Sequence, residues 1–229
     1  MALVCPMMRI DVHATAEDLA EAGADHLAEL LAVTPVTFGL AGGSTPAPTY
    51  QALSRRSLDW SRVTCWLPDE RWVPPDDPAS NALMARRQLI DHVPAQLIAP
   101  DTTLADPGES AAAYQRLLES EFDDGPDVVL LGIGDDGHTA SLFPGTEALG
   151  YKNAGYVANW VDEFGTWRLT ATAPLLHQSD HLLFLVVGQG KAEAVRRILV
   201  DEEPLPARVV AEGAPDVTWL LDSEAAALL

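Results

Sequence analysis

The chain has 229 residues, of which 48% are hydrophobic and 21% are charged, a composition typical of a packed globular protein and unlike that of a disordered or fibrous one. At about 150 residues per domain, this length favours one domain spanning residues 1–229. Fourteen Lys and Arg residues against 34 Asp and Glu residues give a net charge of −20. We therefore expect neither nucleic acid nor an anionic membrane as a partner.

The N-terminal segment and the cysteines indicate a cytoplasmic protein. In MALVCPMMRID the first positive side chain, Arg9, follows the short apolar stretch, which is the wrong order for a secretory signal. The longest strongly apolar run, 182–187, has the length of a strand and falls far short of the roughly 18 residues of a membrane span. Cys5 and Cys65 form no C-x-x-C motif, so we expect no disulfide framework, and Cys65 is expected to be a buried thiol in a strand.

Helical and strand patterns alternate along the chain. Thr15 opens a weak capping box, and apolar residues then recur at helical spacing up to Leu31. A buried strand is predicted at 36–41 and, after a glycine-rich break, a short helix at 49–53. Further strands are predicted at 63–67, 128–133, 169–172, 182–187 and 217–221, and further helices at 81–90, 110–121 and 192–200. This alternation predicts an α/β fold with a mostly parallel sheet covered by helices on both faces.

Ligands of open parallel sheets bind beyond the carboxyl ends of the strands, so the loops that follow strands are the candidate sites. The first is Gly42-Gly43-Ser44-Thr45-Pro46. Its backbone N–H groups and its two hydroxyls can face an anion at the start of the next helix, which suits a phosphate. The Walker pattern G-x-x-x-x-G-K-[ST] is absent, which disfavours nucleoside triphosphate chemistry. In the alternative interpretation, Ser44 and Thr45 only cap the helix.

A second loop carries two carboxylates and a histidine. Residues 132–137 match G-x-G-x-x-G, but Asp135 and Asp136 would repel the pyrophosphate that this motif binds in dinucleotide-binding proteins. His138 is a candidate general base, and Asp136 can fix its tautomer and stabilise its charged form. The alternative is a His–Asp hydrogen bond that serves only the structure.

Three of the scarce positive side chains are candidates for binding an anion. Arg71 follows a strand and can bind an anionic group, or it can pair with a carboxylate and fix the proline-rich loop 74–78. Arg168 precedes the strand pattern at 169–172. Lys191 stands at the start of a predicted helix, where a positive charge is unfavourable unless an anion lies nearby. We expect such an anion, the alternative being a solvated lysine.

Metal-dependent and covalent serine chemistry are both disfavoured. The acidic residues and histidine of these loops could gather around a hard metal ion, but their spacing matches no ligand motif, and no metal is expected. There is no G-x-S-x-G elbow, and neither Ser44 nor Ser141 has the surroundings of an activated serine.

Three segments carry a family resemblance: LAGGSTPAPTYQAL at 40–53, LPDERWVPPDDPASN at 67–81 and, most specifically, LLGIGDDGHTASLFPG at 130–145. Together they resemble the 6-phosphogluconolactonase family. Weaker matches at 168–170, 187–192 and 219–222 extend the resemblance over nearly the whole chain. It implies a modified Rossmann-like, doubly wound α/β fold, similar to that of glucosamine-6-phosphate deaminases. The chain departs from the family where 162–167 replaces a proline-rich stretch.

The resemblance implies hydrolysis of 6-phospho-D-glucono-1,5-lactone to 6-phosphogluconate, in the oxidative pentose phosphate pathway and without a cofactor. It implies that His138 activates water and that Asp136 orients His138. It further implies that the phosphate is held by Gly43, Ser44, Thr45, Arg168 and Lys191, with Arg71 near the lactone or the phosphate.

Two alternatives of different classes remain. One is a sugar-phosphate isomerase or deaminase of the same fold, in which Asp69 would be the base, and Asp69 is therefore a third catalytic candidate. The other is a non-catalytic sugar-phosphate sensor, although the sequence shows no attached DNA-binding segment. The oligomeric state is not fixed by the sequence.

Overall fold

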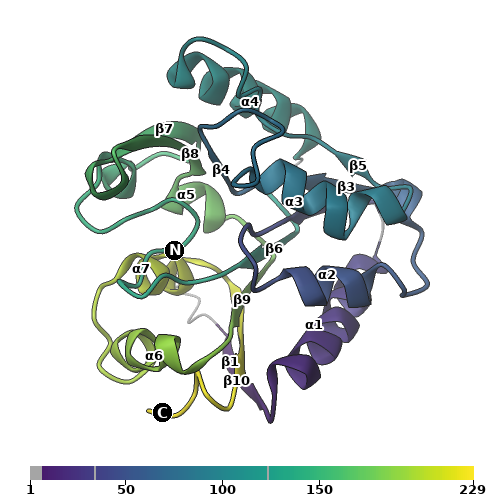
Figure 1. Ribbon diagram of the computed structural model, residues 1–229, viewed down its shortest axis with the longest axis vertical. Helices are drawn as coiled ribbons and strands as arrows, with labels where there is room; N and C mark the ends of the chain where they lie inside the picture. Colours follow the sequence, from purple (N-terminus) through teal and green to yellow (C-terminus); the bar gives the residue numbers. More distant parts are fainter. Residues whose placement is uncertain (1–6, 34, 123) are drawn as a thin grey trace.

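The computed structural model describes residues 7–33, 35–122 and 124–229, and Cys5 lies outside this part of the chain. Within it, seven parallel strands form one sheet in the order β1-β10-β9-β6-β2-β3-β5 (Figure 1). In this order they are Met7–His13, Asp216–Asp222, His181–Val186, Val128–Leu131, Val36–Gly39, Val63–Trp66 and Gln96–Leu97. The chain reverses its direction of strand addition between β2 and β6. Such a switch point is where an open α/β sheet leaves a crevice for a ligand.

Helices cover both faces of this sheet, as the sequence predicts (Figure 1). One face packs against α1 (Ala16–Leu31), α2 (Ala47–Leu53) and α3 (Asn81–Gln88), and the other against α4 (Pro107–Glu121), α5 (Ala173–Leu176), α6 (Ala192–Leu199) and α7 (Pro206–Gly213). Alternate residues of one strand enter opposite cores: in β9, Phe184 packs on the second side and Leu185 on the first. Because both faces of these strands are buried, their sequences are continuous apolar runs.

A second, small sheet lies beside the first and is antiparallel. Its strands are β4 (Asp69–Arg71), β8 (Thr166–Ala171) and β7 (Tyr156–Val161), in the order β4-β8-β7. Arg71 stands opposite Arg168 in the register of β4 and β8. We call β4, β8 and β7 the small sheet. It brings the first and last thirds of the chain together at one edge of the main sheet.

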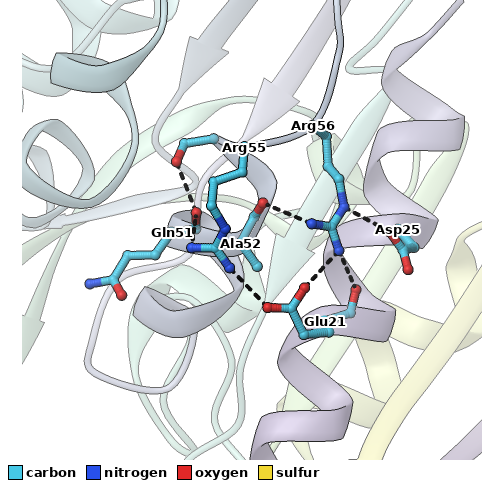
Figure 2. Close-up of polar contacts among 7 residues, drawn as sticks. Glu21, Asp25, Gln51, Ala52, Arg55 and Arg56 are labelled. Atoms are coloured by element: carbon cyan, nitrogen blue, oxygen red, sulfur yellow. Dashed lines mark hydrogen bonds and ion pairs between the residues drawn. The ribbon is translucent and has the colours of Figure 1, made fainter.

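Ion pairs hold α2 against α1 (Figure 2). Arg56, which follows α2, donates to Asp25 Oδ1 and to Glu21 Oε2, both at 2.7 Å, and Arg55 donates to Glu21 Oε1 at 2.9 Å. The hydrogen bond from Arg56 is the main cause of the lowered pKa of Glu21. The two carboxylates are exposed, so each pair contributes little to stability; the pairs join the end of α2 to α1.

The predicted strands and longer helices are present, with ends shifted by a few residues. The capping box is confirmed, because Thr15 is the N-cap of α1 and its hydroxyl accepts from the Asp18 amide at 3.1 Å. Cys65 is confirmed as a free, fully buried cysteine, and burial raises the pKa of its thiol to about 12. No helix in the described part of the chain is long and apolar enough to cross a membrane.

Candidate active site

A cavity of about 290 Å³ opens at the switch point, beyond the carboxyl ends of β2, β6 and β9. The first loop, the strand β4, the loop after β6 and the loop after β9 all contribute to its wall. The polar and charged side chains that line it are Ser44, Thr45, Asp69, Arg71, His138 and Lys191, and its glycines are Gly42, Gly43, Gly132 and Gly134. The structure thus brings together candidate residues that are up to about 150 positions apart in the sequence.

The loop at 42–46 presents two free hydroxyls to this cavity. Pro46 is the N-cap of α2, and no side chain caps that helix, so the hydroxyls of Ser44 and Thr45 do not serve as caps. Neither hydroxyl is hydrogen-bonded to another described residue. Gly43 has a φ of +89°, a conformation that favours glycine. The alternative in which Ser44 and Thr45 cap this helix is therefore wrong, and phosphate binding by the loop stays a prediction.

His138 and Asp136 form a hydrogen-bonded pair at the rim of the cavity. The distance from His138 Nδ1 to Asp136 Oδ1 is 2.6 Å, and the same oxygen accepts from the His138 amide at 3.0 Å. The carboxylate therefore favours a proton on Nδ1 and leaves Nε2 as the acceptor nitrogen. No described residue is hydrogen-bonded to Nε2. This is the arrangement that a general base requires.

Gly134 makes room for this pair. A Cβ on Gly134 would lie 2.0 Å from His138 Nδ1 and 2.6 Å from Asp136 Oδ1, far inside contact distance. The Gly134 amide also donates to the His138 carbonyl at 2.8 Å, which closes the loop around the imidazole. The glycines of the G-x-G-x-x-G match thus have a different use from the one in dinucleotide-binding proteins. The G-x-G-x-x-G match alone did not predict that Gly134 makes room for the His138–Asp136 pair.

Asp69 is buried at the cavity wall and is held by two neutral donors. Ser141 Oγ donates to Asp69 Oδ2 at 2.6 Å, and Asn81 Nδ2 contacts Asp69 Oδ1 at 3.3 Å and the Asp69 carbonyl at 2.8 Å. The Asn81 amide in turn lies against Gly42, where a Cβ would sit 1.9 Å from its Oδ1. Asn81 and Ser141 are positioning residues that the sequence did not identify. They fix Asp69 beside the loop at 42–46.

Glu70 braces the loop that follows β4. Its carboxylate accepts from the amides of Arg71, Asn81 and Ala82, each at 2.7 Å, and from Ser80 Oγ at 3.1 Å. Burial raises the pKa of Glu70, and the three amide donors oppose that rise. This acid therefore joins the start of α3 to β4 and stays away from the cavity.

Arg71 and Arg168 lie side by side on the small sheet. Arg71 donates to the Ala79 carbonyl at 2.7 Å, so it does fix the proline-rich loop, through a carbonyl instead of the expected carboxylate. Neither arginine forms an ion pair with a described residue. Burial, followed by the charge of Arg71, lowers the pKa of Arg168. Arg71 lines the cavity, and Arg168, its partner in the register of β4 and β8, is not among the lining residues.

Lys191 reaches the cavity from the loop after β9. It is the N-cap residue of α6, and its Nζ lies 2.6 Å from Asp135 Oδ1. Lys191 is thus paired with a carboxylate of the protein, on a side chain that is 81% exposed, and a bound anion at this lysine stays a prediction. Asp135 is bound to Lys191 and Asp136 to His138. In the described residues, no group of three or more His, Cys, Asp or Glu side chains is arranged to hold a metal ion.

A profile of the family described as glucosamine-6-phosphate isomerases/6-phosphogluconolactonase matches residues 11–219. The chain belongs to this family. Among curated relatives, it is 40% identical over 205 residues to the 6-phosphogluconolactonase of Nostoc sp., covering 84% of each chain. It is 39% identical over 201 residues to that of Synechocystis sp., covering 82% of each.

Solved structures agree with this family assignment. The 6-phosphogluconolactonase of Trypanosoma brucei superposes with a TM-score of 0.86 at 33% identity, covering 98% of both chains. A monomeric glucosamine-6-phosphate deaminase superposes with a TM-score of 0.83 at 27% identity, covering 97% of this chain and 100% of that one. The predicted family and the modified Rossmann-like fold are confirmed, and both branches of the family share that fold.

Proposed function

We propose that this chain hydrolyses 6-phospho-D-glucono-1,5-lactone to 6-phosphogluconate, the lactonase step of the oxidative pentose phosphate pathway. The observation that carries the proposal is the His138–Asp136 pair, because no described residue is hydrogen-bonded to His138 Nε2 at the wall of a cavity that Ser44 and Lys191 also line. A base and a set of phosphate-binding groups in one cavity suit a phosphorylated ester better than either feature does alone.

In this mechanism His138 Nε2 accepts a proton from water as the water oxygen attacks the lactone carbonyl carbon. Asp136 stabilises the imidazolium that forms, and the tetrahedral oxyanion then expels the ring oxygen, which takes the proton back from His138. No electrons are transferred and no cofactor is consumed. A base of this kind contributes typically about 10²–10⁴ in rate.

A few positively charged groups near the cavity bind the negatively charged phosphate in this proposal. The whole chain carries −20, but charges beyond a Debye length of about 8 Å are largely screened at physiological salt. Lys191, Arg71 and Arg168, with the hydroxyls of Ser44 and Thr45 and the backbone of Gly43, form the proposed phosphate site. Asp69, with both oxygens held by donors, is a fixed acceptor for a substrate hydroxyl and the base of the deaminase alternative.

A coupled assay tests the proposal directly. Glucose-6-phosphate dehydrogenase generates the lactone, and its disappearance is followed with and without the protein, above the spontaneous rate. His138→Ala should lower kcat at least 100-fold while 6-phosphogluconate still binds, and the exposed His92→Ala is the matched control.

Two results would contradict the proposal. One is release of ammonia from glucosamine 6-phosphate while the lactone decays at its spontaneous rate, which would assign the chain to the deaminase chemistry of the family. The other is an unchanged kcat for His138→Ala, which would remove the imidazole from the mechanism. The cytoplasmic location and the lack of a nucleic-acid partner stay predictions from the sequence.

A further inference from the structure

The turn between β7 and β8 holds an aromatic ring against an arginine of the proposed phosphate site. Residues 162–165 form this turn, in the segment where the chain departs from its family resemblance. Phe164 is half exposed, yet its ring centroid lies 5.6 Å from the Arg168 guanidinium carbon. The same ring packs edge-on against Phe143, with centroids 5.6 Å apart at an angle of 70°.

Phe143 gives Phe164 a fixed support. The Phe143 ring lies 4.1 Å from the His138 imidazole, and Thr146 Oγ1 donates to the Phe143 carbonyl at 2.9 Å. Asn159 of β7, fully buried, donates to Thr146 Oγ1 at 3.0 Å and ties this loop to the small sheet. The turn therefore rests on the loop that carries the proposed base, and Phe164 is held in place by more than its own backbone.

The Phe164 ring lies beside Arg168, where a counter-ion would otherwise be expected. Arg168 is partly buried beside the like charge of Arg71, and in the described residues it has no carboxylate within ion-pair distance. Two acids, Asp162 and Glu163, are neighbours of Phe164 in the same turn, but Asp162 accepts instead from Trp160 Nε1 at 2.7 Å. A carboxylate on Arg168 would compete with a bound anion. An aromatic face stabilises a cation without neutralising it.

We propose that Phe164 is a positioning residue for the anion site: it holds Arg168 beside Arg71 in a charged, unpaired state that is ready for a phosphate. This inference rests on the proposed function and gives the β7–β8 turn a role in the affinity of the protein for phosphorylated ligands. Phe164 has no part in the proton transfers.

The test compares KM for the lactone, kcat, and the Kd of 6-phosphogluconate by titration calorimetry. Phe164→Leu should raise KM and Kd about two- to five-fold, with kcat within about two-fold of wild type. Phe164→Tyr keeps an aromatic face, so KM and Kd should stay at their wild-type values. Phe164→Glu should raise them about ten-fold or more, because its carboxylate would pair with Arg168. In an Arg168→Met background, Phe164→Leu should add nothing further.

Trp167→Leu is the control on the same hairpin, because it keeps the hydrogen bond from Trp160 to Asp162. Trp167 packs edge-on against Trp160 on the face of the small sheet opposite Arg168, so its loss should leave KM and Kd unchanged. The inference is overturned if Phe164→Leu and Phe164→Glu bind like wild type, if Trp167→Leu weakens binding equally, or if the effect of Phe164→Leu persists without Arg168. A wild-type protein that binds 6-phosphogluconate but hydrolyses no lactone overturns the proposed function alone, because calorimetry still decides the role of Phe164.

Discussion

Replacing Gly134 by alanine tests whether the loop backbone must approach the imidazole. The new Cβ would lie 2.0 Å from His138 Nδ1 and 2.1 Å from its Cε1, whereas an ordinary contact begins at 3.4 Å. The His138 imidazole must therefore move away by about 1.4 Å. Its hydrogen bond to Asp136 must then break, unless the Asp136 side chain rotates with it. A displacement of about 1 Å at a reacting group can cost about 100-fold in rate. We expect kcat to fall by at least that factor.

The coupled lactone assay measures this loss, and calorimetry with 6-phosphogluconate separates it from binding. Gly150→Ala is the matched control, because a Cβ there meets nothing within 4 Å. The Kd should change little in either variant, since the side chains of the proposed phosphate site are unchanged. A Gly134→Ala protein that folds normally and keeps kcat within about three-fold of wild type would refute the geometric argument.

Three further predictions concern the surroundings of the site. Asp135→Asn should lower KM about two-fold in steady-state kinetics, because its carboxylate no longer competes with phosphate for Lys191, and a raised KM would instead mean that Asp135 orients the lysine. Phe143→Leu should lower kcat several-fold, since it removes the ring that lies against His138, and should also raise KM about two-fold, since the same ring supports Phe164; an unchanged kcat would argue against the first role. Glu70→Gln should become less destabilising relative to wild type as pH rises from 4.5, because burial raises the pKa of Glu70 in the folded state and the stability it gives is lost as pH rises through that value. Urea unfolding of both proteins at several pH values measures this difference, and a difference that is constant with pH would contradict it.

The sequence predicted the central strands well because each is a short apolar run buried on both faces. It did not predict β1, whose apolar side chains Met8, Ile10 and Val12 alternate with polar ones and are exposed at the sheet edge. It also missed β4, since Asp69-Glu70-Arg71 has no apolar pattern and becomes a strand only by pairing with β8. The short elements β5 and α5 were missed because two and four residues carry too little of either period, and β7 and α7 were not predicted either.

The candidate site could be predicted in its residue types but not in its contacts. Loops after parallel strands converge at one edge, so Ser44, His138 and Lys191 could be expected to meet there. The bonds from Ser141 and Asn81 to Asp69 could not, because they join residues 72 and 12 positions apart through a sheet that the sequence does not show. The pairing of Lys191 with Asp135 also depends on tertiary placement.

The imidazole and the two guanidiniums are borne by different sheets. His138 belongs to a loop of the parallel layer, and Arg71 and Arg168 belong to the antiparallel one, with Asn159 as a link between them. On the proposed assignment, substitutions in the β7–β8 hairpin should therefore change which sugar anions bind while the proposed base stays unchanged. Laboratory selection for new substrates should accordingly begin with libraries at that hairpin.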